Sequence, residues 1–121
     1  MYSIDDAPIE LAVSIREFWT ETDWNAAASI AFLESAWDAF AVRDTRDANH
    51  PCGSQLSPIA GVPVTAELSV GYFQINACNF PGWEWQRLYN ARHNAGTAHM
   101  LWVVAGWSPW LFSARALGLL P

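Results

Sequence analysis

Hydrophobic positions in the first part of the chain follow helical spacing. The residues that share one face of a predicted amphipathic helix over 7–20 are Leu11, Ile15, Phe18 and Trp19. Asp6 is the expected N-cap of this helix, and Pro8 falls in its first turn, where the missing N–H costs nothing. Residues 24–38 predict a second helix that is apolar nearly all round, which is typical of a helix buried inside a domain.

The pattern changes after residue 40. Residues 43–69 contain many turn-forming residues and no helical period, so they predict loops with a short hairpin or small sheet that includes 62–68. A third helix is expected from about Asn90 to Gly106, followed by a sharp turn and a short amphipathic tail over 111–119. These elements predict a mainly helical α+β fold, with a small β and loop lobe inserted between the second and third helices.

Length, charge and composition restrict the functions that this chain can have. The 121 residues fit one domain over 1–121, and no apolar run is long enough to span a membrane. Twelve acidic residues against six arginines give a net charge of −6, which disfavours nucleic acids and anionic membrane surfaces as partners. The acidic start of the chain predicts no export signal of its own. Eight tryptophans lead us to expect two or three in a cleft, because flat rings stack well on sugar faces.

Cysteine and histidine positions give little support for metal or thiol chemistry. Cys52 and Cys78 form either a disulfide, in an oxidising compartment, or two thiols in a cytosol. His50 stands close to Cys52, but no second pair of ligands completes a zinc site, so we expect no metal and no cofactor. A cysteine peptidase using either cysteine with His93 or His99 lacks a recognisable nucleophile context.

Glu34 lies toward the C-terminal end of the second helix, and its neighbours Phe32, Leu33, Ala36 and Trp37 are apolar. Apolar neighbours and the negative end of the helix dipole both raise the pKa of such a carboxyl group. A carboxylic acid that keeps its proton near neutral pH can protonate the leaving oxygen of a glycosidic bond. The alternative is a structural ion pair with Arg43 or another arginine.

Four short segments, in the same order, resemble the lysozyme-like superfamily, in particular lytic transglycosylases, goose-type lysozymes and endolysins or tail lysozymes of actinobacterial phages. Residues 33–37 (LESAW) resemble the segment that holds the catalytic glutamate of the family at the end of a helix. Residues 69–75 (SVGYFQI) resemble its "GLMQI"-type segment. Residues 89–91 (YNA) match the start of a long helix, and 106–110 (GWSPW) match the "GWxPW" ending.

The resemblance implies a domain that cleaves the β-1,4 bond between N-acetylmuramic acid and N-acetylglucosamine in peptidoglycan, with Glu34 as the general acid. Ser69 and Gln74 match family positions that border the sugar site, and Tyr72 stands where the family has leucine. Asn90 matches the asparagine that opens the long helix. These four are therefore the expected substrate-binding residues, and for each the alternative is a local hydrogen bond.

A second carboxylate distinguishes two reactions. Retaining and inverting glycosidases need one near the acid, whereas lytic transglycosylases use the same glutamate twice. Asp44 has the spacing found in related phage lysozymes and is the expected second catalytic residue; Asp47 and Glu67 are further candidates. The cluster of charges over 43–47 also fits a solvated loop, so hydrolysis and transglycosylation both stay open.

The acidic composition departs from lysozymes that are basic and act on anionic walls. We therefore expect the chain to reach the bacterial cell wall through another module, a virion component, holin-type release or a larger parent chain. The alternative function is a non-catalytic glycan-binding or structural lysozyme-like domain of a phage or cell-wall assembly.

Overall fold

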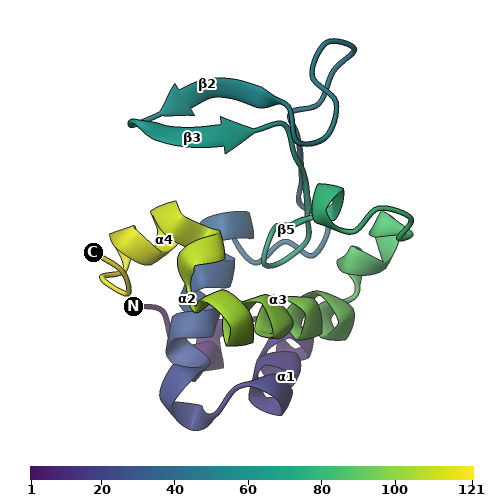
Figure 1. The fold of residues 1–121 in the computed structure, drawn as a ribbon. Coiled ribbons are helices and arrows are strands. Elements are labelled where there is room, and N and C mark those ends of the chain that lie inside the picture. Colours follow the sequence, from purple (N-terminus) through teal and green to yellow (C-terminus); the bar gives the residue numbers. More distant parts are fainter.

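The structure, a computed structural model, describes residues 1–121, and about half of them lie in helices. Figure 1 shows the four α-helices packed together, with both chain ends on the same side of the molecule. The helices are α1 (Ile9–Phe18), α2 (Trp24–Ser35), α3 (Ala91–Ala105) and α4 (Leu111–Ala116). No helix combines the length and the apolar character needed to cross a membrane. The predicted α+β class is confirmed.

The helix starting at residue 7 was predicted too early. Asp6 does not cap it but ends a short 3-10 helix, η1 (Ile4–Asp6), and α1 begins at Ile9. Pro8 explains the difference, because the residue before a proline is disfavoured in the helical region. Ala7 accordingly has an extended backbone, with φ −74° and ψ 156°.

Helix α2 ends three residues before the predicted boundary. Ala36 adopts the left-handed conformation with φ 52°, and Trp37 follows with φ 58°. The Ala36 N–H donates to the Phe32 carbonyl and closes the last turn. The Trp37 ring folds back so that its Nε1 donates to the Ala28 carbonyl at 3.0 Å. Glu34 is therefore held in the last turn of a helix whose end is fixed by two consecutive left-handed residues.

Two small antiparallel sheets lie between α2 and α3, as the pattern of turn formers predicted. One has the strand order β1-β4-β5, and the other is the hairpin β2–β3. Their bounds are β1 (Val42–Asp44), β2 (Gln55–Ile59), β3 (Val62–Thr65), β4 (Leu68–Val70) and β5 (Ile75–Asn76). In Figure 1 the hairpin stands away from the helices, above α4.

The core is built around α2 and strand β4. Residues 26–31 of α2 are all buried, and β4 is buried along its whole length. Small alanines dominate this part of α2, so neighbouring elements approach it closely. A cluster of aromatic rings fills the other side of the core and consists of Trp19, Phe73, His99, Trp102, Trp107 and Trp110.

A buried asparagine joins the turn after β4 to helix α3. The Asn94 amide donates to the Val70 and Leu88 carbonyls, both at 2.9 Å, and its oxygen accepts from the Phe73 N–H. Gly71 has φ +79°, and a Cβ there would lie 2.4 Å from both the Asn94 amide and the Leu88 oxygen. Only glycine fits this close approach. The turn thus sets the position of the segment 71–76 against α3.

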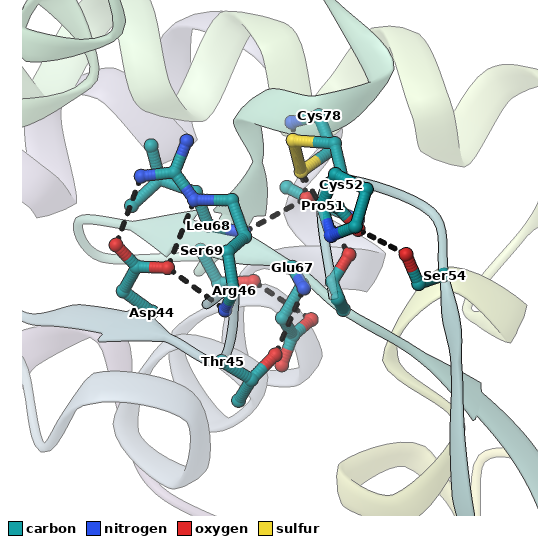
Figure 2. The surroundings of a disulfide bond; sticks show 12 residues. Asp44, Thr45, Arg46, Pro51, Cys52, Ser54, Glu67, Leu68, Ser69 and Cys78 are labelled. Carbon is teal, nitrogen blue, oxygen red and sulfur yellow. Dashed lines mark hydrogen bonds and ion pairs between the residues drawn. A yellow bond between two sulfur atoms is a disulfide. The ribbon is translucent and has the colours of Figure 1, made fainter. Parts of the chain in front are cut away.

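Cys52 and Cys78 form a disulfide. Figure 2 shows the bridge beside the base of the β2–β3 hairpin, near Glu67 and Ser69. No free thiol is present, so the cysteine-peptidase hypothesis is wrong for this state of the protein. The bridge connects the loop after β1 to η3 (Ala77–Asn79), which follows β5. It therefore closes a covalent loop that contains strands β2 to β5.

Candidate active site

A cleft separates the helices from the β lobe. It consists of two adjoining cavities of about 340 Å³ and 630 Å³. The side chains that line both cavities are Leu33, Glu34, Arg43, Glu67, Pro109 and Trp110. Because the two cavities meet at these residues, they form one groove, and Glu34 lies where its two halves join.

Glu34 is a partly buried carboxylate of the cleft, and it is held from two helices. Its backbone belongs to the last turn of α2, and its Oε2 accepts a hydrogen bond from the Ser113 hydroxyl of α4. Burial raises the pKa of Glu34 above its ordinary value, and the negative charge of Glu67 raises it further. The Ser113 hydrogen bond and the positive charge of Arg43 act in the opposite direction. The net effect favours the protonated acid.

Glu67 is the second carboxylate that lines the cleft. Its side chain is 30% exposed, and its Oε1 lies 3.6 Å from Arg43 Nε. The Ser69 hydroxyl donates to its Oε2 at 2.9 Å, and its backbone N–H donates to Thr45 Oγ1. Arg43 therefore pairs with Glu67, and no ion pair joins it to Glu34. The structural ion pair considered for Glu34 is absent.

The two halves of the cleft differ in chemistry. The smaller half carries hydroxyl and amide side chains from β4, the turn before β5, β5 and η3, namely Ser69, Gln74, Asn76 and Asn79. The larger half lies between the hairpin and α4, and its apolar residues include Leu56, Val62, Val64, Leu111 and Phe112. A ligand that occupies both halves therefore meets hydrogen-bonding groups on one side of Glu34 and apolar surface on the other.

Three of the predicted site residues lie in this cleft: Glu34, Ser69 and Gln74. The Gln74 amide nitrogen is already engaged, because it donates to the Ala41 and Gly71 carbonyls at 3.0 and 3.1 Å. Only the side-chain oxygen of Gln74 is left for a ligand. Its amide fixes the loop after α2 against the β lobe.

Asp44 does not reach the cleft. It follows Arg43 in β1, and successive residues of a strand point to opposite faces. Asp44 instead forms a two-point contact with Arg46, whose Nε and Nη2 lie 2.9 and 2.8 Å from its oxygens (Figure 2). The hydrogen bonds from Arg46 lower the pKa of Asp44 to about 2. The structure thus places Asp44 in the solvated charge cluster that was the alternative reading.

Tyr72 is also outside the cleft. It is 1% exposed, and its hydroxyl donates to Glu10 of α1 at 2.5 Å. Burial raises the pKa of Tyr72, and the Glu10 carboxylate raises it further. The turn at Gly71 reverses the chain, so Tyr72 enters the core while Ser69 and Gln74 face the groove. A ligand in the cleft cannot contact Tyr72 while it is buried there.

Asn90 caps helix α3 rather than lining the cleft. Its Oδ1 accepts from the His93 N–H at 3.0 Å, which satisfies one of the free donors at the helix start. Asn90 borders a separate cavity of about 450 Å³ on the side of α3. The predicted start of this helix and its end before Gly106 are confirmed.

The tryptophans contribute less to the cleft than their number suggested. Only Trp110 lines it, and this ring is itself nearly buried, with Nε1 donating to the Phe73 carbonyl at 2.8 Å. The other indole rings pack mainly against the core, except Trp83, which is 43% exposed. Eight tryptophans therefore reflect a core rich in aromatic rings more than a sugar-stacking surface.

Asp44 was ranked above Glu67 as the second carboxylate, although one pattern in the sequence favours Glu67. Glu67 stands two residues before Ser69, a spacing that puts both side chains on one face of a strand. Ser113 had no such signal, because α4 reaches Glu34 only through tertiary packing across 79 residues of chain.

Comparisons of this chain with models of protein families, with curated proteins and with solved structures give no match. The case for a function therefore rests on the residues of the cleft, above all on a half-buried glutamate with a raised pKa at the junction of its two halves.

Proposed function

We propose that this chain is a lysozyme-like domain that cleaves the β-1,4 bond between N-acetylmuramic acid and N-acetylglucosamine in peptidoglycan, with Glu34 as the general acid. The observation that carries the proposal is the position of Glu34. Burial raises the pKa of this carboxyl group, and it lies in the middle of an open groove. Leaving-group oxygens of glycosides need such an acid.

The fold agrees with this reading. Helix α2 ends next to the acid, the β lobe follows it, and the SVGYFQI segment forms β4 and the turn after it. The groove lies between the β lobe and the helices. These are the positions that the sequence resemblance assigns to the corresponding parts of a lysozyme-like domain.

In the proposed reaction the proton of Glu34 moves to the oxygen that bridges the two sugars. The bond from the anomeric carbon to that oxygen breaks, and the departing sugar leaves with a new hydroxyl group. An oxocarbenium-like sugar remains in the groove, beside the ionised Glu34. Ser113 then stabilises the new carboxylate, because its hydroxyl already donates to Glu34 Oε2.

We assign to Glu67 the role of the base that activates water, which the sequence first suggested for Asp44. It faces the same groove, and Arg43 and the Ser69 hydroxyl hold it. In hydrolysis, Glu67 takes a proton from water as the water oxygen bonds to the anomeric carbon. In lytic transglycosylation, the sugar's own 6-hydroxyl forms that bond and returns its proton to Glu34, and Glu67 takes no part.

The test is cleavage of purified peptidoglycan by wild type, Glu34→Gln and the matched control Glu21→Gln. Glu21 is an exposed glutamate of a short 3-10 helix and lines none of the cavities described above. A general acid contributes about 10²–10⁴-fold, so Glu34→Gln should lose at least a hundredfold while Glu21→Gln stays within twofold. A loss of less than tenfold in Glu34→Gln removes the acid from its proposed role.

Mass analysis of the same products separates the two reactions. New reducing ends identify hydrolysis, and 1,6-anhydro ends identify transglycosylation. Glycan binding by wild type without any product favours the alternative, a non-catalytic or structural domain. The experiment thus decides among all three readings in one preparation.

The proposed place of action is the bacterial cell wall. A disulfide between Cys52 and Cys78 fits an oxidising compartment better than a cytosol. The net charge of −6 gives no electrostatic attraction to an anionic wall, which is consistent with delivery by another module or by a virion component.

A further inference from the structure

The cavity beside the start of α3 has features of a ligand site that the catalytic cleft does not use. Its volume is about 450 Å³, and it shares no residue with either half of the cleft. Residues from α1, from the loop before η4 (Trp85–Tyr89) and from α3 line it: Phe18, Trp83, Asn90, His93, Thr97 and Met100.

An indole ring forms one wall of this cavity and is held in place. Trp83 is 43% exposed, and Phe80 stacks against it with ring centroids 4.2 Å apart and planes 23° apart. The segment starts directly after η3, which the Cys52–Cys78 bridge ties to the β lobe. An exposed ring that is already oriented loses little conformational freedom when a flat ligand stacks on it.

Hydrogen-bonding groups with free capacity lie next to this ring. Asn90 uses its oxygen to cap α3, whereas its amide nitrogen donates to no group in the structure. His93 is packed against Trp83, with centroids 5.6 Å apart, and its Nε2 is buried without a partner. Unpaired buried polar atoms are uncommon in proteins and call for an explanation, and His93 is one of the residues that line this cavity.

The cavity carries no free charge that would select an ion. Its arginine, Arg92, forms a two-point ion pair with Glu17, at 2.7 to 3.0 Å, and lies over the Phe18 ring. The ligand that fits is therefore uncharged, with a flat apolar face and several hydroxyl or amide groups. A pyranose ring of a glycan has this chemistry.

We propose that this cavity is a second, non-catalytic sugar-binding site that retains the domain on an insoluble glycan. The identity of the polymer rests on the proposed function, whereas the existence of the site does not. The negative charge of this domain does not attract it to an anionic glycan, so uncharged contacts have to keep it bound there. Two sites on one rigid domain raise the apparent affinity for a polymer, because binding of the second becomes intramolecular.

The test measures binding in the absence of turnover, so it does not depend on the success of the catalytic proposal. Glu34→Gln serves as the parent, and its apparent Kd is determined on insoluble peptidoglycan and on chitin, which has no peptide. Adding Trp83→Ala should weaken binding to both about tenfold. The matched control is Phe40→Ala, which removes an aromatic ring that is 71% exposed and lines none of the three cavities; it should stay within twofold.

A second variant separates binding from folding. Asn90→Asp keeps an oxygen that can cap α3, and an acidic residue is favourable at a helix start, but it removes the amide donor. We expect weaker glycan binding with no loss of thermal stability. Equal binding by the parent and Trp83→Ala overturns the proposal, as does an equal loss in Phe40→Ala. An effect of Trp83→Ala on binding to peptidoglycan but not to chitin also overturns it, because the site then does not recognise the pyranose rings that the two polymers share.

Discussion

The hydrogen bond from Ser113 to Glu34 leads to a prediction about the pH dependence of activity. As the general acid, Glu34 has to be protonated when substrate binds, so activity should fall as the pH rises through its pKa. The Ser113 hydroxyl stabilises the ionised form and lowers the pKa of Glu34 against the effect of burial. Ser113→Ala should therefore move the alkaline limb of the kcat/KM profile to higher pH.

The size of the effect follows from the chemistry of this contact. A hydrogen bond to a charged group contributes about 1.5–3 kcal/mol, and 1.36 kcal/mol corresponds to a tenfold change in a protonation equilibrium. The protonated acid also bonds to the hydroxyl, so part of this energy is common to both forms. We therefore expect the ratio of protonated to ionised Glu34 to rise about tenfold at any given pH.

The assay is kcat/KM against pH on soluble glycan fragments for wild type, Ser113→Ala and Ser108→Ala. Ser108 is exposed and bonds only to the Ala105 carbonyl, so it controls for loss of a serine near the same turn. Its profile should coincide with that of wild type. An alkaline limb in Ser113→Ala that stays in place, or moves to lower pH, would falsify the assignment of that limb to Glu34.

Three further outcomes follow from the structure. Burial raises the pKa of Glu34, so the folded protein keeps this proton at pH values where the unfolded chain has lost it. The free energy of unfolding therefore falls as the pH rises from the pKa of the unfolded chain to that of the folded protein. Glu34→Gln should unfold at a higher urea concentration than wild type above this pH range and at the same concentration below it. Tyr72→Phe removes the contact with Glu10 and should cost about 1 kcal/mol of unfolding free energy, with cleavage within twofold of wild type; a selective loss of cleavage would put Tyr72 back at the substrate. Asp44→Asn should keep cleavage activity within twofold of wild type. Glu67→Gln should lose about a hundredfold in cleavage activity if the products have reducing ends. A large loss in Asp44→Asn with none in Glu67→Gln would return the role of second carboxylate to Asp44.

The sequence contains enough information for the helical body and for the acid, because these depend on local pattern. The long apolar helix and its one carboxylate identify Glu34, and Asn90 and Gly106 mark the ends of α3. The conformations of Ala36 and Trp37 were not predictable, since both are residues that rarely adopt positive φ. Tertiary contacts hold them there.

The errors at the site have a common physical cause. Asp44 was chosen by its spacing from Glu34 and Tyr72 by its place in the SVGYFQI segment, but a strand and a tight turn reverse side-chain direction from one residue to the next. Asp44 thus points away while Arg43 faces the groove, and Tyr72 is buried while Gln74 lines it. Which of two neighbouring residues reaches a cleft is decided by the sheet register, which Gly71 and buried Asn94 help to set.

The Cys52–Cys78 bridge divides the candidate active site into two parts that differ in their resistance to local unfolding. Glu67, Ser69, Gln74 and Asn76 all lie between the two cysteines, in a covalently closed segment, whereas Glu34 and Ser113 belong to helices outside it. Loss of a bridge of this span typically costs about 2–4 kcal/mol, and local opening concentrates where few other contacts hold the chain. Warming the reduced protein should therefore abolish turnover at a temperature at which the far-ultraviolet circular dichroism of the helices is still intact.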